Sequence, residues 1–84
     1  MSNYQIVVLE GSWHYVGHVE KTETEIIITD SYNIRYWGTT KGLGELRDGP
    51  TAKTRYDATG TVRAPLSRLR HTIDTNGVEW PAPK

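Results

Sequence analysis

The middle of the chain combines the residue types that hold a small anionic ligand. Residues 35–46 read RYWGTTKGLGEL, with two adjacent aromatic rings, two cations, a threonine pair and three glycines. Glycines let backbone N–H groups approach a ligand, threonine and lysine donate hydrogen bonds to an anion, and aromatic faces stack on planar rings. This composition is typical of a binding loop.

The candidate ligand-binding residues each offer a hydrogen-bond donor, a close backbone approach or a stacking face. They are Arg35, Tyr36, Trp37, Gly38, Thr39, Thr40, Lys41, Gly42, Gly44 and Lys53. In this interpretation Lys41 supplies charge and Trp37 stacks on a base. The glycine spacing matches neither the G-x-x-x-x-G-K-S/T nor the G-x-G-x-x-G nucleotide motif, so an ordinary glycine-rich turn is the alternative.

Strand spacing predicts how two of these side chains are arranged. Arg35 and Trp37 are two residues apart, so they are expected to share one face of a strand, with Ile34 and Tyr36 on the other. Arg35 would then contact a ligand beside Trp37, or lie over its ring as a surface cation–π pair.

Two histidines have a spacing that invites a metal interpretation. His14 and His18 are at i and i+4, which binds zinc on a helix. Their segment is predicted to be a strand, where they would lie ~13 Å apart. We therefore expect no metal site.

No residue pattern predicts catalysis. The chain has no cysteine, and Ser12, Ser31 and Ser67 lack a G-x-S-x-G context. Acidic residues such as Glu45 and Asp48 have no spacing that requires acid–base catalysis. We expect a protein that is not an enzyme and needs no cofactor.

Charge limits the classes of partner. Ten basic and ten acidic residues give a formal net charge of zero, so no global field attracts nucleic acid or an anionic membrane. A local basic patch is still compatible with this balance. Lys53, Arg55 and Arg63 form a candidate basic rim beside the glycine-rich segment, or they are solvated strand faces.

Size and aromatic content favour association. A chain of 84 residues without disulfides buries only roughly 60% of its unfolded surface. Three Trp and five Tyr, with no Phe, place apolar area on rings that suit interfaces. We expect one domain that forms a homo-oligomer. We expect neither a signal peptide nor a membrane span, and a cytoplasmic location.

Short β-branched runs separated by turn residues predict strands in the first part of the chain. Strands are expected over 4–9, 13–21 and 25–29, the first two joined as a hairpin. Asp30-Ser31 is expected to be a turn, followed by an extended segment over 33–37.

Glycines then predict a loop over 38–50, in which Leu43 and Leu46 seat at most one helical turn. The elements expected after it are a weak strand over 51–56, a turn over 57–60, a strand over 61–64, a 3₁₀ turn after Pro65 and a last strand around Ile73. The tail over 76–84 ends as coil or docks by Trp80.

This order of elements resembles small SH3-like barrels of the Sm-like kind. The residues that carry the resemblance are Val7-Val8-Leu9, Gly17, Val62-Arg63-Ala64-Pro65, Leu69 and Ile73. It implies an all-β fold with one β-barrel domain over 1–75, a long glycine-rich insertion loop over 38–56, and a tail over 76–84. The uridine-binding residues of Sm-like proteins have no clear counterparts here, so their RNA function is not carried over.

A second resemblance concerns the candidate loop. Residues 34–46, with Gly49-Pro50-Thr51 after them, resemble small bacteriophage proteins of unknown function. The resemblance implies a phage or prophage origin, and hence the cytoplasm of a host cell, and it assigns no biochemical activity.

Together these observations favour a non-enzymatic homo-oligomer that sequesters a small phosphorylated ligand, such as a nucleotide or cyclic nucleotide signal. In a phage this would counter a nucleotide-based host defence. A single-stranded RNA or DNA binder with the same aromatic residues is one alternative, which zero net charge disfavours. A virion or host-protein adaptor is the other, with Trp13, Trp37 and Trp80 buried in its interface.

Overall fold

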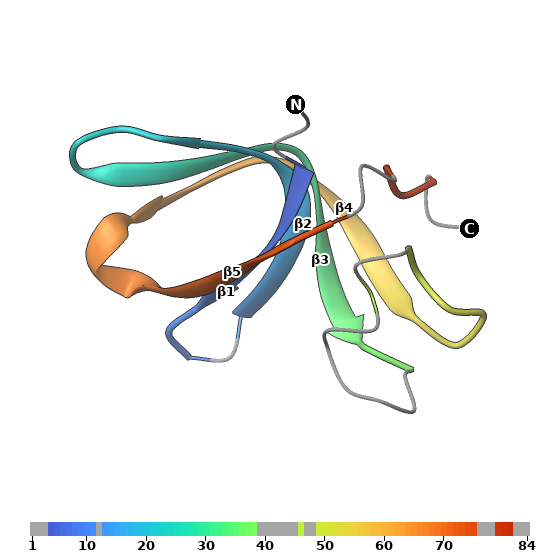
Figure 1. Cartoon of the computed structure of the whole chain (residues 1–84). Helices are drawn as coiled ribbons and strands as arrows, with labels where there is room; N and C mark the ends of the chain where they lie inside the picture. Colours follow the sequence, from blue (N-terminus) through green and yellow to red (C-terminus); the bar gives the residue numbers. More distant parts are fainter. Residues whose placement is uncertain (1–3, 12, 39–45, 47–48, 76–78, 82–84) are drawn as a thin grey trace.

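Five antiparallel strands form one sheet in the order β4-β3-β2-β1-β5 (Figure 1). The computed structural model describes residues 4–11, 13–38, 46, 49–75 and 79–81. Its elements are β1 (Tyr4–Leu9), β2 (Trp13–Lys21), β3 (Glu25–Tyr36), β4 (Arg55–Pro65), the 3₁₀ helix η2 (Leu66–Arg68) and β5 (Leu69–Asp74). The predicted all-β fold is confirmed. Strands β4 and β5 are the two edges, and they are not hydrogen-bonded to each other within the described residues.

Two tight turns join the first three strands. Gly11 in the β1–β2 turn has a φ of 89°, which favours glycine. In the β2–β3 turn the Thr22 N–H donates to the Glu25 carbonyl at 2.9 Å, and the Glu25 N–H donates to the Thr22 hydroxyl at 3.1 Å. The strands predicted over 4–9 and 13–21 and their hairpin are confirmed.

Strands β3 and β4 bend in the middle instead of ending there. Asp30 lies within β3 with a φ of 48°, and Gly60 lies within β4 with a φ of 66°. Between the two strands the buried Ser31 hydroxyl donates to the Gly60 carbonyl at 2.6 Å. The predicted turns at 30–31 and 57–60 are therefore wrong, because turn-type residues here form bulges that leave the strands paired.

Strand β2 passes this bend at a glycine. Gly17 is buried, and a Cβ on it would lie 2.8 Å from both the Thr29 carbonyl oxygen and Ile28 Cγ2. The register of β2 with β3 shifts between Val16 and His18. Only glycine lets the two strands approach so closely where the sheet folds back.

The other strand boundaries also differ from expectation. The segments predicted over 25–29 and 33–37 belong to one strand, β3, which ends at Tyr36. Strand β4 begins at Arg55, so the strand predicted over 51–56 is wrong for its first four residues. The predicted 3₁₀ turn and last strand are confirmed as η2 and β5.

The bend divides the apolar side chains into two clusters. The first core cluster contains Tyr4, Ile6, Val16, Ile34, Leu46 and Trp80, with Tyr32, Trp37, Tyr56 and Ile73 packed against it. The second core cluster contains Val7, Leu9, Val19, Ile26 and Ile28, with Tyr15, Val62, Ala64, Leu66 and Leu69 packed against it. Strand β1 supplies both, since successive residues such as Ile6 and Val7 point to opposite faces.

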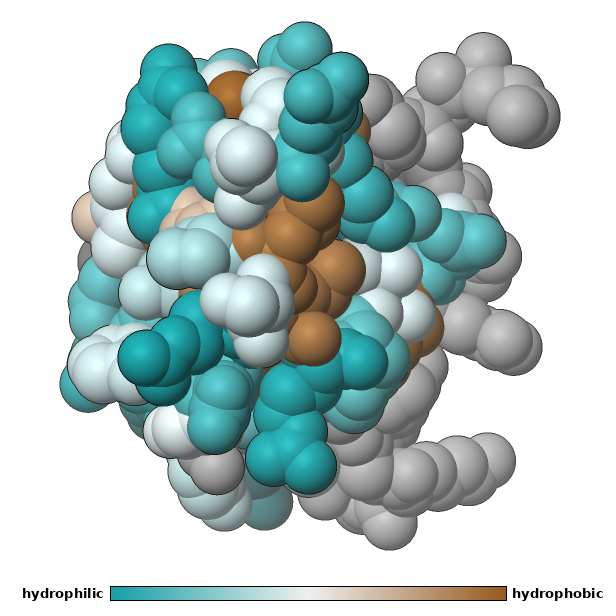
Figure 2. Space-filling view, turned by 90° about the vertical axis from the view of Figure 1, so that its left-hand side faces the viewer, coloured by the Kyte–Doolittle hydropathy of each residue, from teal (hydrophilic) through white to brown (hydrophobic). Residues whose placement is uncertain are grey.

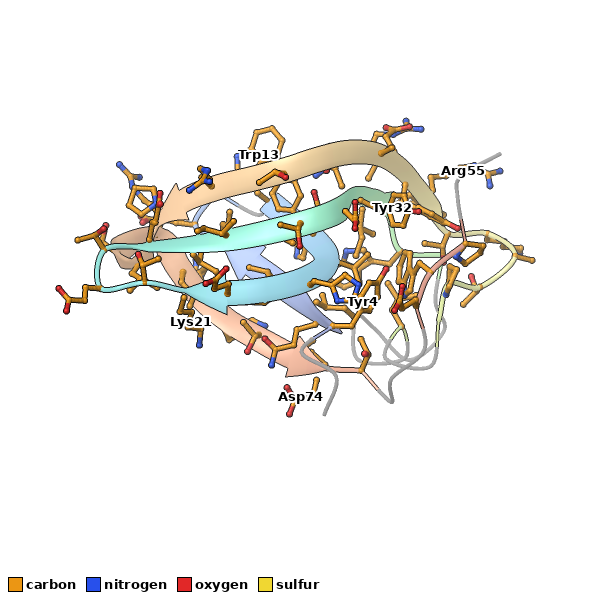
Figure 3. The ribbon with its side chains drawn as sticks, turned by 90° about the horizontal axis from the view of Figure 1, so that it is seen from above. Tyr4, Trp13, Lys21, Tyr32, Arg55 and Asp74 are labelled. Carbon is orange, nitrogen blue, oxygen red and sulfur yellow. The ribbon has the colours of Figure 1, made fainter. Side chains whose placement is uncertain are left out.

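The two clusters occupy different halves of the molecule. Figure 2 looks at the end formed by the β2–β3 hairpin and η2, and it shows brown apolar atoms surrounded by hydrophilic surface. Leu66 and Leu69 of the second core cluster are only partly buried. Figure 3 shows Tyr32 and Arg55 in the other half, away from Lys21 at the hairpin. The described part of the chain contains no helix with the length and hydropathy that a membrane crossing requires.

Candidate functional site

The candidate loop connects β3 to β4, and the structure describes its two ends. Arg35, Tyr36, Trp37, Gly38 and Lys53 are described. Thr39, Thr40, Lys41, Gly42 and Gly44 lie outside the described residues, as does Leu43. The assignment of all ten residues to a ligand site stays a prediction, and the geometry below concerns the described ends.

Arg35 is paired within the sheet. Its guanidinium forms an ion pair with the carboxylate of Asp57 on the neighbouring strand β4. The two side chains are 58% and 53% exposed. Exposed pairs of this kind contribute at most about 1 kcal/mol, so an anionic ligand can compete with Asp57 for Arg35.

The side chains at the end of β3 do not alternate as expected. Ile34 is buried in the first core cluster, whereas Tyr36 is 59% exposed. Trp37 packs against the cluster that contains Ile34 and meets the His14 ring edge on, with centroids 5.1 Å apart. The predicted shared face for Ile34 and Tyr36 is therefore wrong, because the β3–β4 register shifts between them and β3 ends at Tyr36. Tyr36 is the more accessible of the two stacking rings.

Two threonines close the base of the loop. The Thr54 hydroxyl donates to the Trp37 carbonyl at 2.7 Å, and the Thr51 hydroxyl donates to the Gly38 carbonyl at 2.8 Å. The Thr51 N–H in turn donates to the Thr54 hydroxyl at 2.9 Å. We call Thr51 and Thr54 the threonine clamp. Sequence reasoning missed it, although a threonine pair spaced i, i+3 after Gly-Pro is a recognisable turn signal.

Gly38 is the residue that this clamp holds. It has a φ of 62°, and a Cβ on it would lie 2.5 Å from the carbonyl carbon of Lys53. A side chain at this position is excluded by both conformation and space. The two ends of the loop are thus in direct backbone contact, and Lys53 is brought next to the end of β3.

The candidate basic rim contains paired and unpaired cations. Arg63 forms an ion pair with Glu25 at 3.0 Å, in the half of β4 remote from the loop. Among the described residues, no acidic side chain lies within salt-bridge distance of Lys53 or Arg55. Arg55 is the register partner of Tyr36. Two cations without an acidic partner in the described part of the chain therefore lie near one exposed ring at this end of the sheet.

A second group of rings lies on the sheet next to the loop. The aromatic face consists of Tyr4, Tyr32 and Tyr56. The rings of Tyr32 and Tyr56 are 5.2 Å apart, and the Trp80 ring lies 4.8 Å from Tyr56. Sequence reasoning offered docking through Trp80 as one alternative but did not identify its partners, which are Tyr4 on β1 and Tyr56 on β4.

Burial and hydrogen bonds tune the hydroxyls of the aromatic face. The backbone N–H of Trp80 donates to the Tyr4 hydroxyl at 3.0 Å. Burial raises the pKa of Tyr4 above its ordinary value of 10.0, the hydrogen bond from Trp80 lowers it in part, and Tyr32, Glu79 and Tyr56 raise it further. Burial and Tyr32 raise the pKa of Tyr56 in the same direction. Both phenols therefore stay neutral at physiological pH.

One polar group in this region is buried without a partner. Within the described part of the chain, the Trp80 indole N–H is the buried side-chain donor that has no hydrogen-bond acceptor. Leaving such a donor unsatisfied costs about 1–3 kcal/mol. Trp80 is therefore well buried against the sheet, but its indole N–H is left without a hydrogen bond.

The two histidines lie on β2, as the strand prediction required. His14 meets Trp37, and His18 meets the Tyr4 ring edge on at 5.0 Å. Within the described residues, no group of three metal-ligating side chains lies close enough together to hold a metal ion.

No protein-family model matches the chain, and neither a curated protein nor a solved structure is significantly similar to it.

Proposed function

We propose that the protein is a non-enzymatic binding module that sequesters a small phosphorylated ligand, such as a nucleotide or a cyclic nucleotide signal. The proposal includes a small SH3-like barrel of the Sm-like kind. The strand order and the 3₁₀ helix between β4 and β5 support this class. The proposal also keeps a homo-oligomer, a phage origin and a role against host defence in the host cytoplasm, which depend on composition and on the resemblance of residues 34–46.

The observation that carries the ligand class is the grouping of one exposed ring with two cations that have no acidic partner among the described residues. Tyr36 offers a face for a base, and Arg55 stands opposite it on β4. Lys53 is held beside the end of β3 by the close contact of its backbone with Gly38. A base on Tyr36 with phosphate oxygens on Lys53 and Arg55 uses all three groups.

Mass spectrometry of small molecules released by denaturing the purified protein tests the ligand class directly. A nucleotide released at about one per chain, or per pair of chains, supports the proposal. Binding of oligonucleotides with a steep salt dependence supports the single-stranded nucleic acid alternative instead. A stoichiometric host or virion protein without a small molecule supports the adaptor alternative.

Mutation tests the site separately. Replacing Lys53 and Arg55 together by Ala should weaken binding of the released nucleotide about 100- to 10,000-fold, because each of the two charge-assisted hydrogen bonds is worth about 1.5–3 kcal/mol. Titration calorimetry measures the change. Arg63→Ala is the matched control, since this cation is already paired with Glu25. Equal affinities for the double variant and the wild type would exclude this site.

The structure gives little support to an adaptor whose interface with another protein buries all three tryptophans. Trp80 is 4% exposed within its own chain, and Trp37 packs against the first core cluster. Trp13 is 56% exposed. An interface with another protein would therefore use Trp13 rather than the three rings together.

A further inference from the structure

The C-terminal segment, residues 79–81, is held through its main chain as well as through its largest side chain. The backbone N–H of Trp80 donates to the Tyr4 hydroxyl at 3.0 Å, and the Tyr56 hydroxyl donates to the Pro81 carbonyl at 2.9 Å. Between these hydrogen bonds the Trp80 side chain is almost completely buried and meets the Tyr56 ring edge on. The segment therefore contacts Tyr56 twice, and Tyr56 is the second residue of β4.

Tyr56 connects this docking to the ligand site proposed above. It directly follows Arg55, and successive residues of a strand point to opposite faces. Arg55 is exposed, whereas Tyr56 packs against the first core cluster. The contacts of Trp80 and Pro81 with Tyr56 therefore support the start of β4, where Arg55 stands.

Leu46 connects the same cluster to the loop. Its side chain is completely buried in the first core cluster, to which Trp80 also belongs. Leu46 lies outside the strands, so its position depends on side-chain packing rather than on strand pairing. Its carbonyl accepts a hydrogen bond from the Gly49 N–H at 2.9 Å, shortly before Thr51 of the threonine clamp. The cluster that contains Trp80 thus also supports the turn that leads to Lys53.

We propose that Trp80 is a positioning residue of the ligand site. In the docked segment it holds Leu46 and Tyr56 in place, and through them Lys53 and Arg55. Trp80 is the largest side chain among the buried residues of the first core cluster, so a smaller ring there leaves a gap into which its neighbours can shift. The effect on ligand affinity rests on the proposed function, whereas the effect on the loop ends does not.

Hydrogen exchange at the base of the loop tests the proposal without a ligand. The probes are the backbone N–H groups of Gly49, Thr51 and Thr54, each of which donates a hydrogen bond there. Trp80→Phe keeps an aromatic ring and the backbone hydrogen bonds of the segment, so it should fold. Because it leaves a gap in the cluster, these amides should exchange about 5- to 10-fold faster than in the wild type.

A second variant acts on the main chain of the segment. Tyr4→Phe removes the hydroxyl that accepts the backbone N–H of Trp80, and it does so on β1, which is adjacent to neither β3 nor β4. The same amides should exchange about 3- to 5-fold faster. Ile28→Val is the matched control, because it removes a buried methyl group from the second core cluster and should change these rates less than about 2-fold. Unchanged rates in either of the first two variants, or an equal acceleration in Ile28→Val, would overturn the proposal.

Binding of adenosine monophosphate then relates the loop ends to the ligand site. Titration calorimetry should give Trp80→Phe an affinity about 3- to 10-fold lower than that of the wild type, and Ile28→Val should bind as the wild type does. Equal affinities for Trp80→Phe and the wild type would show that the site does not need Trp80 and would overturn the proposal. A wild type that does not bind this nucleotide would count against the proposed function instead, and the exchange rates would then decide the positioning role on their own.

Discussion

Gly17 has no side chain beyond a hydrogen atom, and this lets β2 and β3 approach closely where the sheet folds back on itself. Gly17→Ala should lower the free energy of unfolding by about 1–3 kcal/mol, as overpacking does in a tight site. The reason is that the added methyl group would lie 2.8 Å from the backbone carbonyl oxygen of Thr29, which cannot rotate away. Chemical denaturation measures the loss.

Gly60 provides the control for this prediction. It has a φ of 66°, but nothing lies within 4 Å of the position that a Cβ would take. Asn tolerates this left-handed conformation, so Gly60→Asn should cost less than about 1 kcal/mol. Equal losses for the two variants would contradict the steric explanation for Gly17.

The hydroxyl of Tyr4 links stability to alkaline pH. Burial raises its pKa above the ordinary value of 10.0. Because the folded state holds this proton more tightly than the unfolded state, the stabilisation is complete below pH 10 and is lost as pH rises through the folded-state pKa. Tyr4→Phe should be less stable at neutral pH by about 1 kcal/mol, because the backbone N–H of Trp80 loses its acceptor.

The same variant should lose less stability than the wild type when pH rises above 10. Denaturation midpoints at neutral and alkaline pH measure both effects. Parallel curves for Tyr4→Phe and the wild type would show that another group controls alkaline unfolding.

At the scale of elements, the threonine clamp joins the end of β3 to the start of β4. Thr54→Val keeps the shape of the side chain but removes the hydroxyl that donates to the Trp37 carbonyl and accepts from the Thr51 N–H. Since Thr54 is buried, both groups lose their partner, and unfolding should become easier by about 1–3 kcal/mol. Thr61→Val, at an exposed position of β4, should have almost no effect. Similar denaturation midpoints for the two variants would contradict the role of the clamp.

Local patterns predict the elements of this chain well where a branched apolar run meets a turn. Strands β1 and β2 and the 3₁₀ helix η2 were predicted in this way. The bend was not, because Asp30 and Gly60 are residues that usually end a strand, and here they sit in bulges inside β3 and β4. A bulge depends on the neighbouring strand, which a local pattern does not contain.

For the candidate site, too, local features were predictable from the sequence and contacts between distant residues were not. The sequence indicates the glycine-rich loop, and the structure brings Lys53 and Tyr36 to its two ends. The pairing of Arg35 with Asp57 and the contact of Tyr4 with Trp80 join residues 22 and 76 positions apart. Such pairs follow from the strand order, and no spacing within one element predicts them.

At the scale of the whole molecule, the first strand meets the described C-terminal segment. Tyr4 begins β1 and contacts Trp80, and the Thr75 hydroxyl donates to the Tyr4 carbonyl at 2.6 Å. The C-terminal segment therefore belongs to the first core cluster. A domain of this size has a total stability of only about 5–15 kcal/mol, so one buried ring is a large fraction of it.

Trp80→Ala should for this reason lower the free energy of unfolding by about 3–5 kcal/mol, the usual cost of removing a buried Trp side chain. Trp13→Ala removes the same number of atoms from a ring that is 56% exposed, and its cost should stay below about 1 kcal/mol. Denaturation of both variants at equal protein concentration compares them directly. If Trp80→Ala is no less stable than Trp13→Ala, the sheet folds without its C-terminal segment. The contacts of the C-terminal segment would then contribute little to the stability of the fold.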